Sequence, residues 1–344
     1  MRTTVAADMP SITQEGASEG ASPPARRDLA GACLAHMLHD GYTDQLYALL
    51  PVWQTQFGLS YAAVAVVRAL YYGTMGILQV PGDRAVSRLP PRTALALATV
   101  VAAAGFAVVS LPFGFAGLCA GLVLAGIGSS VQHPRASLLV TRAYGRAARG
   151  PLGIYNFAGD LGKSIFPVVV ALLLPVVAWR PVVGLMAGVG LVTAAALLAV
   201  LPRQPVSAPA DAKPAGHGDG GSGFWLLFAI GALDTATRMG YLLFLPFLLH
   251  TRGAGGAEVG LGLALLFGGG ALGKAACGWL GERLGVVWSV ALTEAATALL
   301  MVATVLTPLR LTLVLLPLLG IVLNGTSSVL YGTVPDLAPK GDTG

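Results

Sequence analysis

The sequence predicts an all-α membrane protein with several spanning helices, and three observations lead to this fold class. Of the 344 residues, 55% are hydrophobic and only 11% are charged, whereas a soluble domain has roughly 25% charged residues. The mean hydropathy is +0.74. The apolar residues gather in runs of about 20, the helix length that crosses roughly 30 Å of hydrocarbon at about 1.5 Å per residue.

Ten apolar runs are long enough to be read as spans, and a polar segment precedes the first of them. Residues 1–28 have no apolar period and are expected to form a disordered cytoplasmic tail. Arg26 and Arg27 imitate the start of a signal peptide, but the run that follows is too long and lacks a clean cleavage site, so we expect it to be retained. The expected spans are 29–51, 61–82, 93–111, 116–140, 152–174, 180–201, 224–249, 258–281, 286–306 and 311–334.

The loops between the spans differ in positive charge, and this difference predicts the orientation. One set of alternate loops holds most of the basic residues, including Arg84, Arg88, Arg92, Arg142, Arg146 and Arg149, whereas the other holds only Arg180, Arg252 and Arg310. The basic side is cytoplasmic by the positive-inside rule, so the N-terminus is expected in the cytoplasm and the chain in the cell (inner or plasma) membrane. Because these residues sit in short loops, they indicate topology and no nucleic-acid partner is expected.

The three cysteines, Cys33, Cys119 and Cys277, lie far apart inside candidate spans. This spacing favours apolar packing, and the sequence shows no metal-ligand cluster, phosphate loop or nucleophile elbow. Neither a cofactor nor a metal is therefore expected, and the protein is not expected to be an enzyme.

The first span carries ionisable residues at a depth where they are costly and therefore indicate function. At about 100° per residue, His36, Asp40 and Asp44 share with His39, Thr43 and Tyr47 one face about 140° wide. Such a stripe should face the bundle interior or a water-filled cavity. His36 and Asp40, one turn apart, can share a proton, so we assign His36, Asp40 and Asp44 to proton coupling. The alternative is a structural hydrogen-bonded cluster.

Two further spans each carry an acid followed by a base at a spacing that permits pairing within one helix. These pairs are Asp160 with Lys163 and Asp234 with Arg238. On one interpretation the pairs only lower the free-energy cost of inserting charges into the membrane. On the other, binding of substrate or a proton breaks a pair, which would couple occupancy of the site to helix movement. On the second interpretation they are candidate substrate-binding residues, together with Asn324.

The remaining charged residues of the spans allow several interpretations. Arg68 and Lys274 have side chains long enough to reach an interface, whereas Glu294 lies near mid-span. His133 and Arg135, close to the cytoplasmic end of the fourth span, either contact lipid headgroups or form part of a gate. Acids and bases are equal in number across the spans, which favours internal pairs that rearrange.

A linker and a repeat divide the chain. Residues 202–223 are rich in Pro and Gly and are expected to form a cytoplasmic linker between a six-helix half, 29–201, and a second half, 224–344. Three segments of the first half recur in the second in the same order and at nearly the same offset: LYALLPVW with YLLFLPFLL, PGDRAVSRL with LGERLG, and GIGSS with NGTSS. Each half begins on the same side, so the repeats are parallel.

Two such halves joined by a cytoplasmic loop resemble the major facilitator superfamily. Its signature Gly-x-x-x-Asp/Glu-Arg-x-Gly is matched in the second half by Gly278, Glu282, Arg283 and Gly285; the first half keeps Asp83 and Arg84 but has Gln79 and Val86 at the glycine positions. The resemblance implies that Asp83, Arg84, Glu282 and Arg283 form a cytoplasmic gate. The alternative is a charged turn that only sets topology.

Within that superfamily, GIGSSVQHPRAS at 126–137, NFAGDLGKS at 156–164, and His36 and Asp40 followed by Leu49-Leu50-Pro51 resemble the fosmidomycin-resistance-like branch. The resemblance implies a proton-coupled exporter of a small organic molecule that works by alternating access. The expected partners are therefore a small-molecule substrate, protons and the lipid bilayer, and a monomer is expected. One departure is Leu122, where many proton-driven members have an arginine, so proton coupling must be placed elsewhere.

Other interpretations stay open. The resemblance implies twelve spans, so the last two are expected to be missing and the 344-residue chain to be poorly active or a non-transporting remnant. An importer of an organic anion through Lys163 and Arg238 is the alternative within the same class. An intramembrane enzyme using His39, Asp40 or His133 is disfavoured by the repeat, because an enzyme needs only one site.

Overall fold

The computed structural model describes residues 22–203 and 221–337; the side chains of Arg146, Ala275, Gly278 and residues 324–337 lie outside that description. The described residues form helices, with no strand among them. The first group comprises α1 (Pro23–Asp44), α2 (Leu46–Phe57), α3 (Tyr61–Ile77), α4 (Gln79–Ala85), α5 (Pro91–Ser110), α6 (Gly114–Ser129), α7 (Gln132–Tyr144), the 3₁₀ turn η1 (Gly145–Ala147), α8 (Arg149–Leu173) and α9 (Trp179–Val200). The second comprises α10 (Ser222–Thr251), α11 (Gly256–Leu284), α12 (Val286–Leu306) and α13 (Leu309–Leu337).

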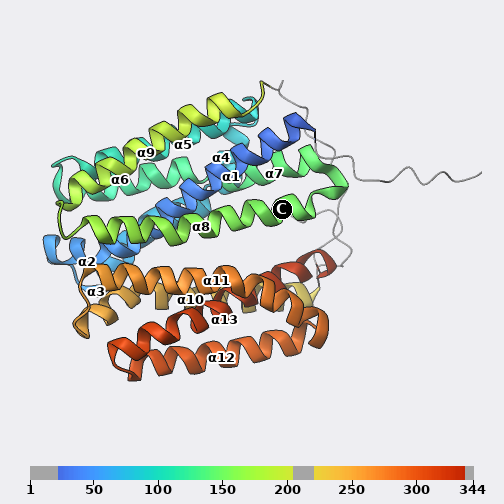
Figure 1. Ribbon diagram of the computed structural model, residues 1–344. Helices are drawn as coiled ribbons and strands as arrows, with labels where there is room; N and C mark the ends of the chain where they lie inside the picture. Colours follow the sequence, from blue (N-terminus) through green and yellow to red (C-terminus); the bar gives the residue numbers. More distant parts are fainter. Residues whose placement is uncertain (1–21, 204–220, 338–344) are drawn as a thin grey trace, which may run out of the picture.

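The two groups lie side by side with their helices roughly along one direction (Figure 1). Helix α11 packs against α8, and α10 packs against α2, so these four helices form the boundary between the groups. Within the first group α1 packs against α7, α8 and α9, and is thus covered on several sides. The polar stripe of the first span is therefore held inside the bundle, as its cost in lipid requires.

Length and composition identify the spans. Among the described residues, seven helical segments are long and apolar enough to cross a membrane, and the pair α3–α4, which bends by 55°, makes an eighth if it is one span. Each of the ten predicted ranges falls on a helix or on a helix pair. The α1–α2 pair is not among these segments, and the apolar stretch Leu309–Leu323 of α13 is too short. The membrane class is confirmed, and the number ten stays a prediction.

The first helix begins earlier than expected. Helix α1 starts at Pro23, a residue whose fixed φ suits the first helical turn, so the last part of the predicted tail is helical. Arg27 donates hydrogen bonds to the carbonyl oxygens of Val200 (2.8 Å) and Ala199 (3.0 Å) at the end of α9. A cation suits the free carbonyls of a helix C-terminus, so this contact fixes the start of α1. The remainder of the predicted tail, 1–21, and residues 204–220 of the predicted linker lie outside the described residues.

Small residues let α8 approach α1 closely. A Cβ on Gly162 would collide with the backbone carbonyl of Met37, and one on Gly159 would lie 2.7 Å from Asp40 Oδ2 and from His36 Nε2. Close approach at glycine is the usual way helices pack in membranes. At Gly159 it brings the backbone of α8 directly against the charged residues of α1.

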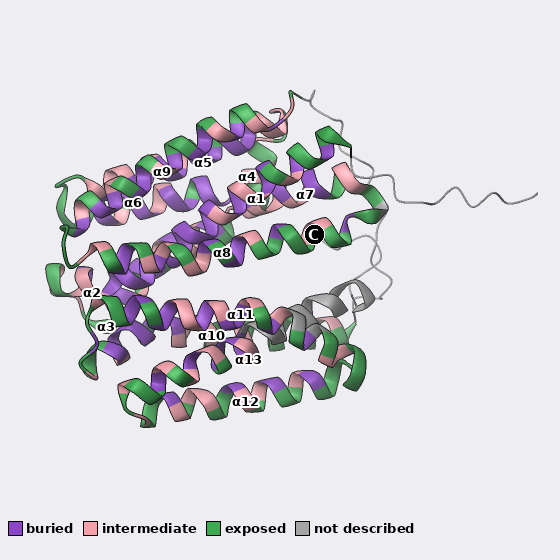
Figure 2. Ribbon diagram, viewed as in Figure 1, coloured by how far each residue is buried: buried purple, intermediate pink, exposed green. Residues whose placement is uncertain are grey.

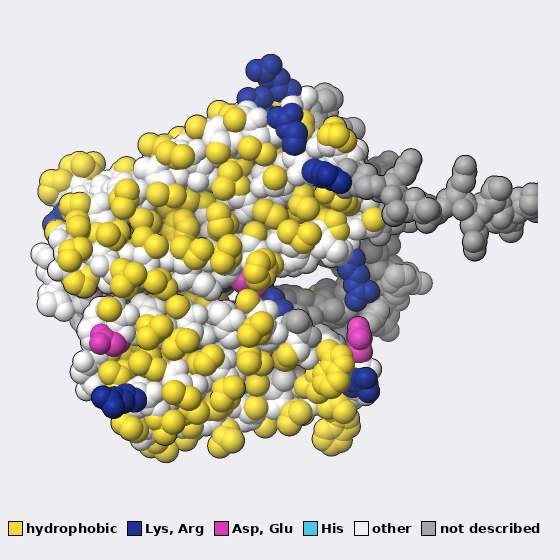
Figure 3. All heavy atoms as spheres, viewed as in Figure 1, with side chains coloured by type: hydrophobic (Ala, Val, Ile, Leu, Met, Phe, Trp, Pro, Cys, Tyr) yellow, Lys and Arg dark blue, Asp and Glu magenta, His cyan; other side chains and the backbone are white. Residues whose placement is uncertain are grey.

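The surface agrees with a lipid environment. Buried residues gather along the interior of the first group, whereas α12 is largely exposed (Figure 2). Its exposed side chains are apolar, among them Val287, Trp288, Leu299 and Leu306. Apolar side chains also cover most of the face in Figure 3, with charged groups mainly near the ends. A continuous apolar surface of this kind requires lipid as its solvent.

Candidate functional site

The site is built around His36 and Asp40 on α1. His36 Nδ1 lies 2.8 Å from the backbone carbonyl oxygen of Tyr155, and Nε2 lies 3.1 Å from Asp40 Oδ2. A carbonyl oxygen only accepts, so Nδ1 carries a hydrogen. The contact with Asp40 is then a hydrogen bond only if a second hydrogen lies between Nε2 and Oδ2. The arrangement therefore calls for a proton shared by these two buried groups.

Two further groups reach the same carboxylate. Lys163 Nζ of α8 lies 3.1 Å from Asp40 Oδ2, and His133 Nε2 of α7 lies 3.4 Å from Asp40 Oδ1. Asp40 is only 4% exposed. A buried carboxylate requires such partners, because its charge is costly away from water.

The ionic contacts continue from the first group into the second. Lys163 Nζ is 3.9 Å from Asp160 Oδ1, and Lys274 Nζ of α11 lies 2.7 Å from both oxygens of Asp160. The two bonds from Lys274 join α11 to α8. His36, Asp40, Lys163, Asp160 and Lys274 thus form a connected series, called the ion chain below. In Figure 3 a hollow opens between the two groups of helices, with acidic and basic atoms at its inner edge.

This pairing differs from the one expected from sequence. Asp160 and Lys163 were expected to neutralise each other within α8, but each has a closer partner on another helix. Lys274, whose side chain is long enough to reach an interface, pairs with Asp160. Interhelical partners lie closer because α1 and α11 pack on the two sides of α8.

His133 and His39 also lie in surroundings that the sequence did not indicate. His133 was expected at a headgroup or gate but contacts Asp40, and its ring meets that of His36 edge-on at 5.1 Å between centroids. His39 was placed on the polar face; its ring nitrogens lie 2.9 Å from Ser129 Oγ and 3.1 Å from Thr99 Oγ1. It ties α1 to α6 and α5, away from the ion chain.

Asp44 belongs to a second cluster. Its Oδ1 lies 3.8 Å from Arg68 Nη2, which also donates to the hydroxyl of Tyr47 at 3.2 Å. The Arg68 guanidinium lies over the rings of Tyr47 (4.7 Å) and Tyr72 (4.9 Å). Arg68 was expected to extend toward an interface but is buried, so it was missed as a site residue. Asp44, one turn from Asp40, thus has Arg68 as its ion-pair partner, while Lys163 acts electrostatically on both carboxylates.

The remaining substrate candidates lie on other helices. Asp234 and Arg238 are half-buried on α10, and Arg238 is close enough to Asp44 for an electrostatic interaction. The Asn324 side chain lies outside the described residues.

The predicted gate residues fall into two classes. Arg135 of α7 contacts Asp83 of α4 through Nε (2.5 Å to Oδ1) and Nη2 (2.7 Å to the backbone oxygen). By contrast, Arg84, Glu282 and Arg283 are exposed, and Arg283 lies over the ring of Trp279 at 5.3 Å. The specific feature here is that Arg135 combines an ion pair to the Asp83 carboxylate with a hydrogen bond to the Asp83 backbone oxygen, and sequence reasoning had not joined these two residues.

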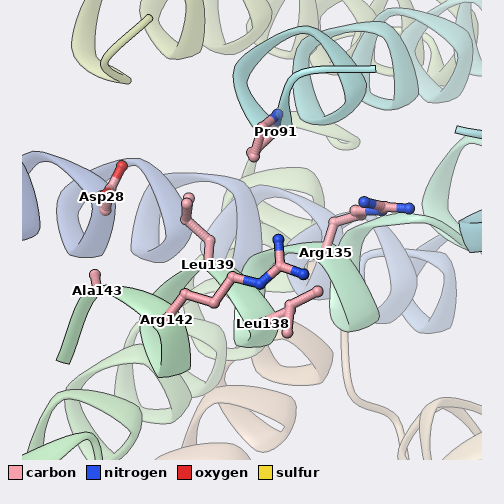
Figure 4. Close-up of a pocket in the computed structure, with 7 residues that line it drawn as sticks. All are labelled: Asp28, Pro91, Arg135, Leu138, Leu139, Arg142 and Ala143. Atoms are coloured by element: carbon pink, nitrogen blue, oxygen red, sulfur yellow. The ribbon is translucent and has the colours of Figure 1, made fainter. Parts of the chain in front are cut away.

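A pocket of about 260 Å³ lies next to this contact (Figure 4). It opens between the starts of α1 and α5 and one face of α7. Arg135 and Arg142 reach it from α7, and Asp28 lines it from α1. The lining residues are Asp28, Pro91, Arg135, Leu138, Leu139, Arg142 and Ala143.

The fold also gathers possible metal ligands that the sequence spacing did not reveal. One ligand atom from each of His36, Asp40 and His133 lies within 4.8 Å of the others. These residues come from two helices, so the sequence offers no local motif for them.

The apolar helices around a buried ion chain define a multi-span membrane protein, and similarity assigns its family. The chain matches the family model of the Major Facilitator Superfamily over residues 32–344 and therefore belongs to that family. It is 23% identical over 146 residues to the fosmidomycin resistance protein of Escherichia coli strain K12. That match covers 42% of this chain and 36% of the relative, about a third of its length.

Solved structures share the fold. An inward-facing, occupied structure of a bacterial homologue of the human lysosomal transporter Spinster has a TM-score of 0.71 at 19% identity, covering 91% of this chain and 74% of that one. A POT family transporter in complex with 5-aminolevulinic acid has a TM-score of 0.63 at 14% identity, covering 91% and 85% respectively. At these identities the likeness concerns the fold alone.

Proposed function

We propose that this protein is a proton-coupled secondary transporter that exports a small organic molecule by alternating access. The half 29–201 would rock against the half 224–344 around a central site. Membership of the Major Facilitator Superfamily supports transport. The name of the fosmidomycin resistance relative supports export and makes fosmidomycin the first compound to test.

The observation that carries the proposal is the ion chain. The Asp40 carboxylate contacts His36, His133 and Lys163, and its contact with His36 requires a proton between the two side chains. A proton on Asp40 weakens its attraction for Lys163. Asp160 then becomes the nearest carboxylate for Lys163, since the separation is 3.9 Å. The effect of proton uptake at Asp40 thereby reaches α8, the helix that packs against α11 of the second group.

Movement follows from the last link. Asp160 holds Lys274 of α11 across the boundary of the two groups. Once Asp160 shares its charge between two lysines, its hold on Lys274 weakens, and the equilibrium shifts toward a state in which the groups separate there. A shift of this kind requires only that protonation favour one conformation over the other.

The other predicted residues take supporting roles in this proposal. Substrate would contact Asp160 and Lys163 beside the ion chain, with Asp234, Arg238 and Asn324 on the opposite half. The cytoplasmic gate would consist of Asp83, Arg84, Glu282 and Arg283, closed on the first half by the Asp83–Arg135 contact. The N-terminus would lie in the cytoplasm of a cell (inner or plasma) membrane.

The test replaces Asp40 with Asn, which keeps the shape of the side chain and removes its charge. Proton-driven fosmidomycin uptake by inverted vesicles should fall by roughly tenfold or more, the range of typical coupling energies. Glu258→Gln is the matched control, because Glu258 is an exposed carboxylate that caps the start of α11. Undiminished proton coupling in Asp40→Asn would refute the assignment.

Import of an organic anion is the second candidate, and the cation Arg68 favours it. Among the described residues, Nε and Nη1 of Arg68 are buried without a hydrogen-bond partner. An anionic substrate would satisfy these donors. Right-side-out vesicles distinguish the two directions: a proton gradient that accumulates the anion there, with no accumulation in inverted vesicles, would establish import.

A further inference from the structure

We propose that His36, Asp40 and His133 bind a divalent transition-metal ion of the zinc type. The inference goes beyond the proposed function, because it makes Asp40, the carboxylate proposed to bind a proton, a ligand of a metal ion as well. Two imidazoles and one carboxylate are ligands suited to Zn²⁺, Co²⁺ or Ni²⁺, whereas Mg²⁺ and Ca²⁺ prefer oxygen alone.

The distances fit a metal centre. Ligand atoms about 2.0–2.1 Å from a tetrahedral ion lie roughly 3.3–3.4 Å from one another. His36 Nε2 and Asp40 Oδ2 are 3.1 Å apart, and His133 Nε2 and Asp40 Oδ1 are 3.4 Å apart. These two distances involve different oxygens of Asp40, and the three ligand atoms lie within 4.8 Å of one another, so the two imidazoles must turn toward one oxygen to hold a single ion.

The outer hydrogen bonds also fit. A ligating histidine usually donates its other ring N–H to a backbone carbonyl or carboxylate, which fixes the ring and its tautomer. His36 Nδ1 makes this bond to the Tyr155 carbonyl at 2.8 Å, and the two rings stack at 4.0 Å. His36 therefore directs the lone pair of Nε2 toward Asp40. Either a proton or a metal ion between these two side chains would bind that lone pair.

Access and coordination number are suited to reversible binding. His36 and Asp40 are buried, but the side chain of His133 is 32% exposed and gives the site an open side. Three protein ligands leave a fourth position for water or for a substrate atom. The described residues around the site supply the three ligands and no further histidine or cysteine to this group.

Lys163 would compete with a metal ion for the Asp40 carboxylate. Its ammonium lies 3.1 Å from Asp40 Oδ2, so a bound ion would repel it. Asp160 Oδ1, at 3.9 Å, already offers an alternative partner. Metal binding would thus act on the ion chain as a proton does, by moving Lys163 from Asp40 to Asp160. Zinc-type ions are therefore expected to compete with protons and to inhibit proton-driven transport.

The test uses the full chain, purified without a polyhistidine tag and titrated with Co²⁺. One ion per chain should produce the visible absorption bands of a tetrahedral site. His36→Gln and His133→Gln should each weaken binding by roughly 10- to 100-fold, at least as much as loss of an outer partner does. His250→Gln is the control, since His250 is exposed at the end of α10.

The variant Lys163→Gln distinguishes loss of the metal site from misfolding. Removing the competing cation should tighten Co²⁺ binding, an effect that a damaged fold does not produce. Binding that is unchanged in both histidine variants, or unaltered by Lys163→Gln, would overturn the proposal. Proton coupling measured in the presence of a chelator separates the two hypotheses. If Co²⁺ does not bind but transport depends on Asp40, only the metal site is overturned. If Co²⁺ binds but transport does not depend on Asp40, only the proposed function is overturned.

Discussion

Asp40 and Asp44 lie one turn apart on α1 and are about equally buried, with 4% and 5% of their surfaces exposed. Their partners nevertheless differ in kind. Asp40 contacts two histidines and a lysine, groups whose protonation or position changes readily. Asp44 faces Arg68, whose guanidinium stays charged and is held between two tyrosine rings.

The difference shows how neighbouring carboxylates acquire separate roles. The partners of Asp40 include Lys163, which has a second acid within reach, so its contacts rearrange without leaving a charge unpaired. Asp44 makes its one printed ion pair among the described residues with Arg68, while Lys163 and Arg238 act on it from farther away, so separating the pair leaves two buried charges without a close partner. We therefore expect Asp40 to be the switching carboxylate, and Asp44 to assist proton coupling through Lys163 while its pair with Arg68 holds α1 against α3.

The largest expected effect tests the fixed pair. Arg68→Ala removes the ion-pair partner of buried Asp44 and leaves it only the more distant Lys163 and Arg238, and breaking a buried pair costs about 3–5 kcal/mol. The thermal unfolding temperature of the purified chain should drop strongly. Replacing both partners, as Asp44→Leu with Arg68→Met, should recover most of the loss. A double variant no more stable than Arg68→Ala would contradict a purely structural pair.

A smaller effect is expected at the switching cluster. Gly159→Ala places a Cβ 2.7 Å from Asp40 Oδ2 and from His36 Nε2, so these side chains must separate or α8 must shift. Overpacking of this kind costs about 1–3 kcal/mol. Proton-driven transport should fall about tenfold, the scale of a typical coupling energy.

Gly188→Ala is the matched control for Gly159→Ala, because a Cβ there meets no atom within 4 Å. Both variants should be compared for expression, unfolding temperature and transport. Full proton coupling in Gly159→Ala would show that close contact between α8 and the His36–Asp40 pair is not required.

The smallest effect on stability is expected for Lys274→Gln. The Lys274 side chain is 38% exposed, so its pair with Asp160 contributes only about 0–1 kcal/mol to folding. The conformational equilibrium should change more than the stability. Spin labels at Ser87 and Leu284, exposed positions on the two groups, should report a larger population of long distances. An unaltered distance distribution would remove Lys274 from the coupling route.

The helical class, the apolar ranges and the importance of α1 could be predicted from the sequence. Apolar runs and a polar stripe are local properties, since bilayer thickness fixes helix length and the helical repeat fixes the face. The same reasoning gave His36 with Asp40 as a pair, because residues four apart on one helix meet whatever surrounds them. The signature around Asp83 likewise pointed to the family.

Only the tertiary structure decided which partner each charge takes. Asp160 and Lys163 satisfy the local spacing rule, yet Lys274 and Asp40 lie closer, because α11 and α1 pack on either side of α8. His133 is 93 positions beyond Asp40 in the printed sequence, and no periodicity relates them. Local sequence determines that a charge is present and on which face of its helix it lies. Its partner depends on how closely the helices pack, and here glycines such as Gly159 allow the approach that joins His36, Asp40 and Lys163 into one site.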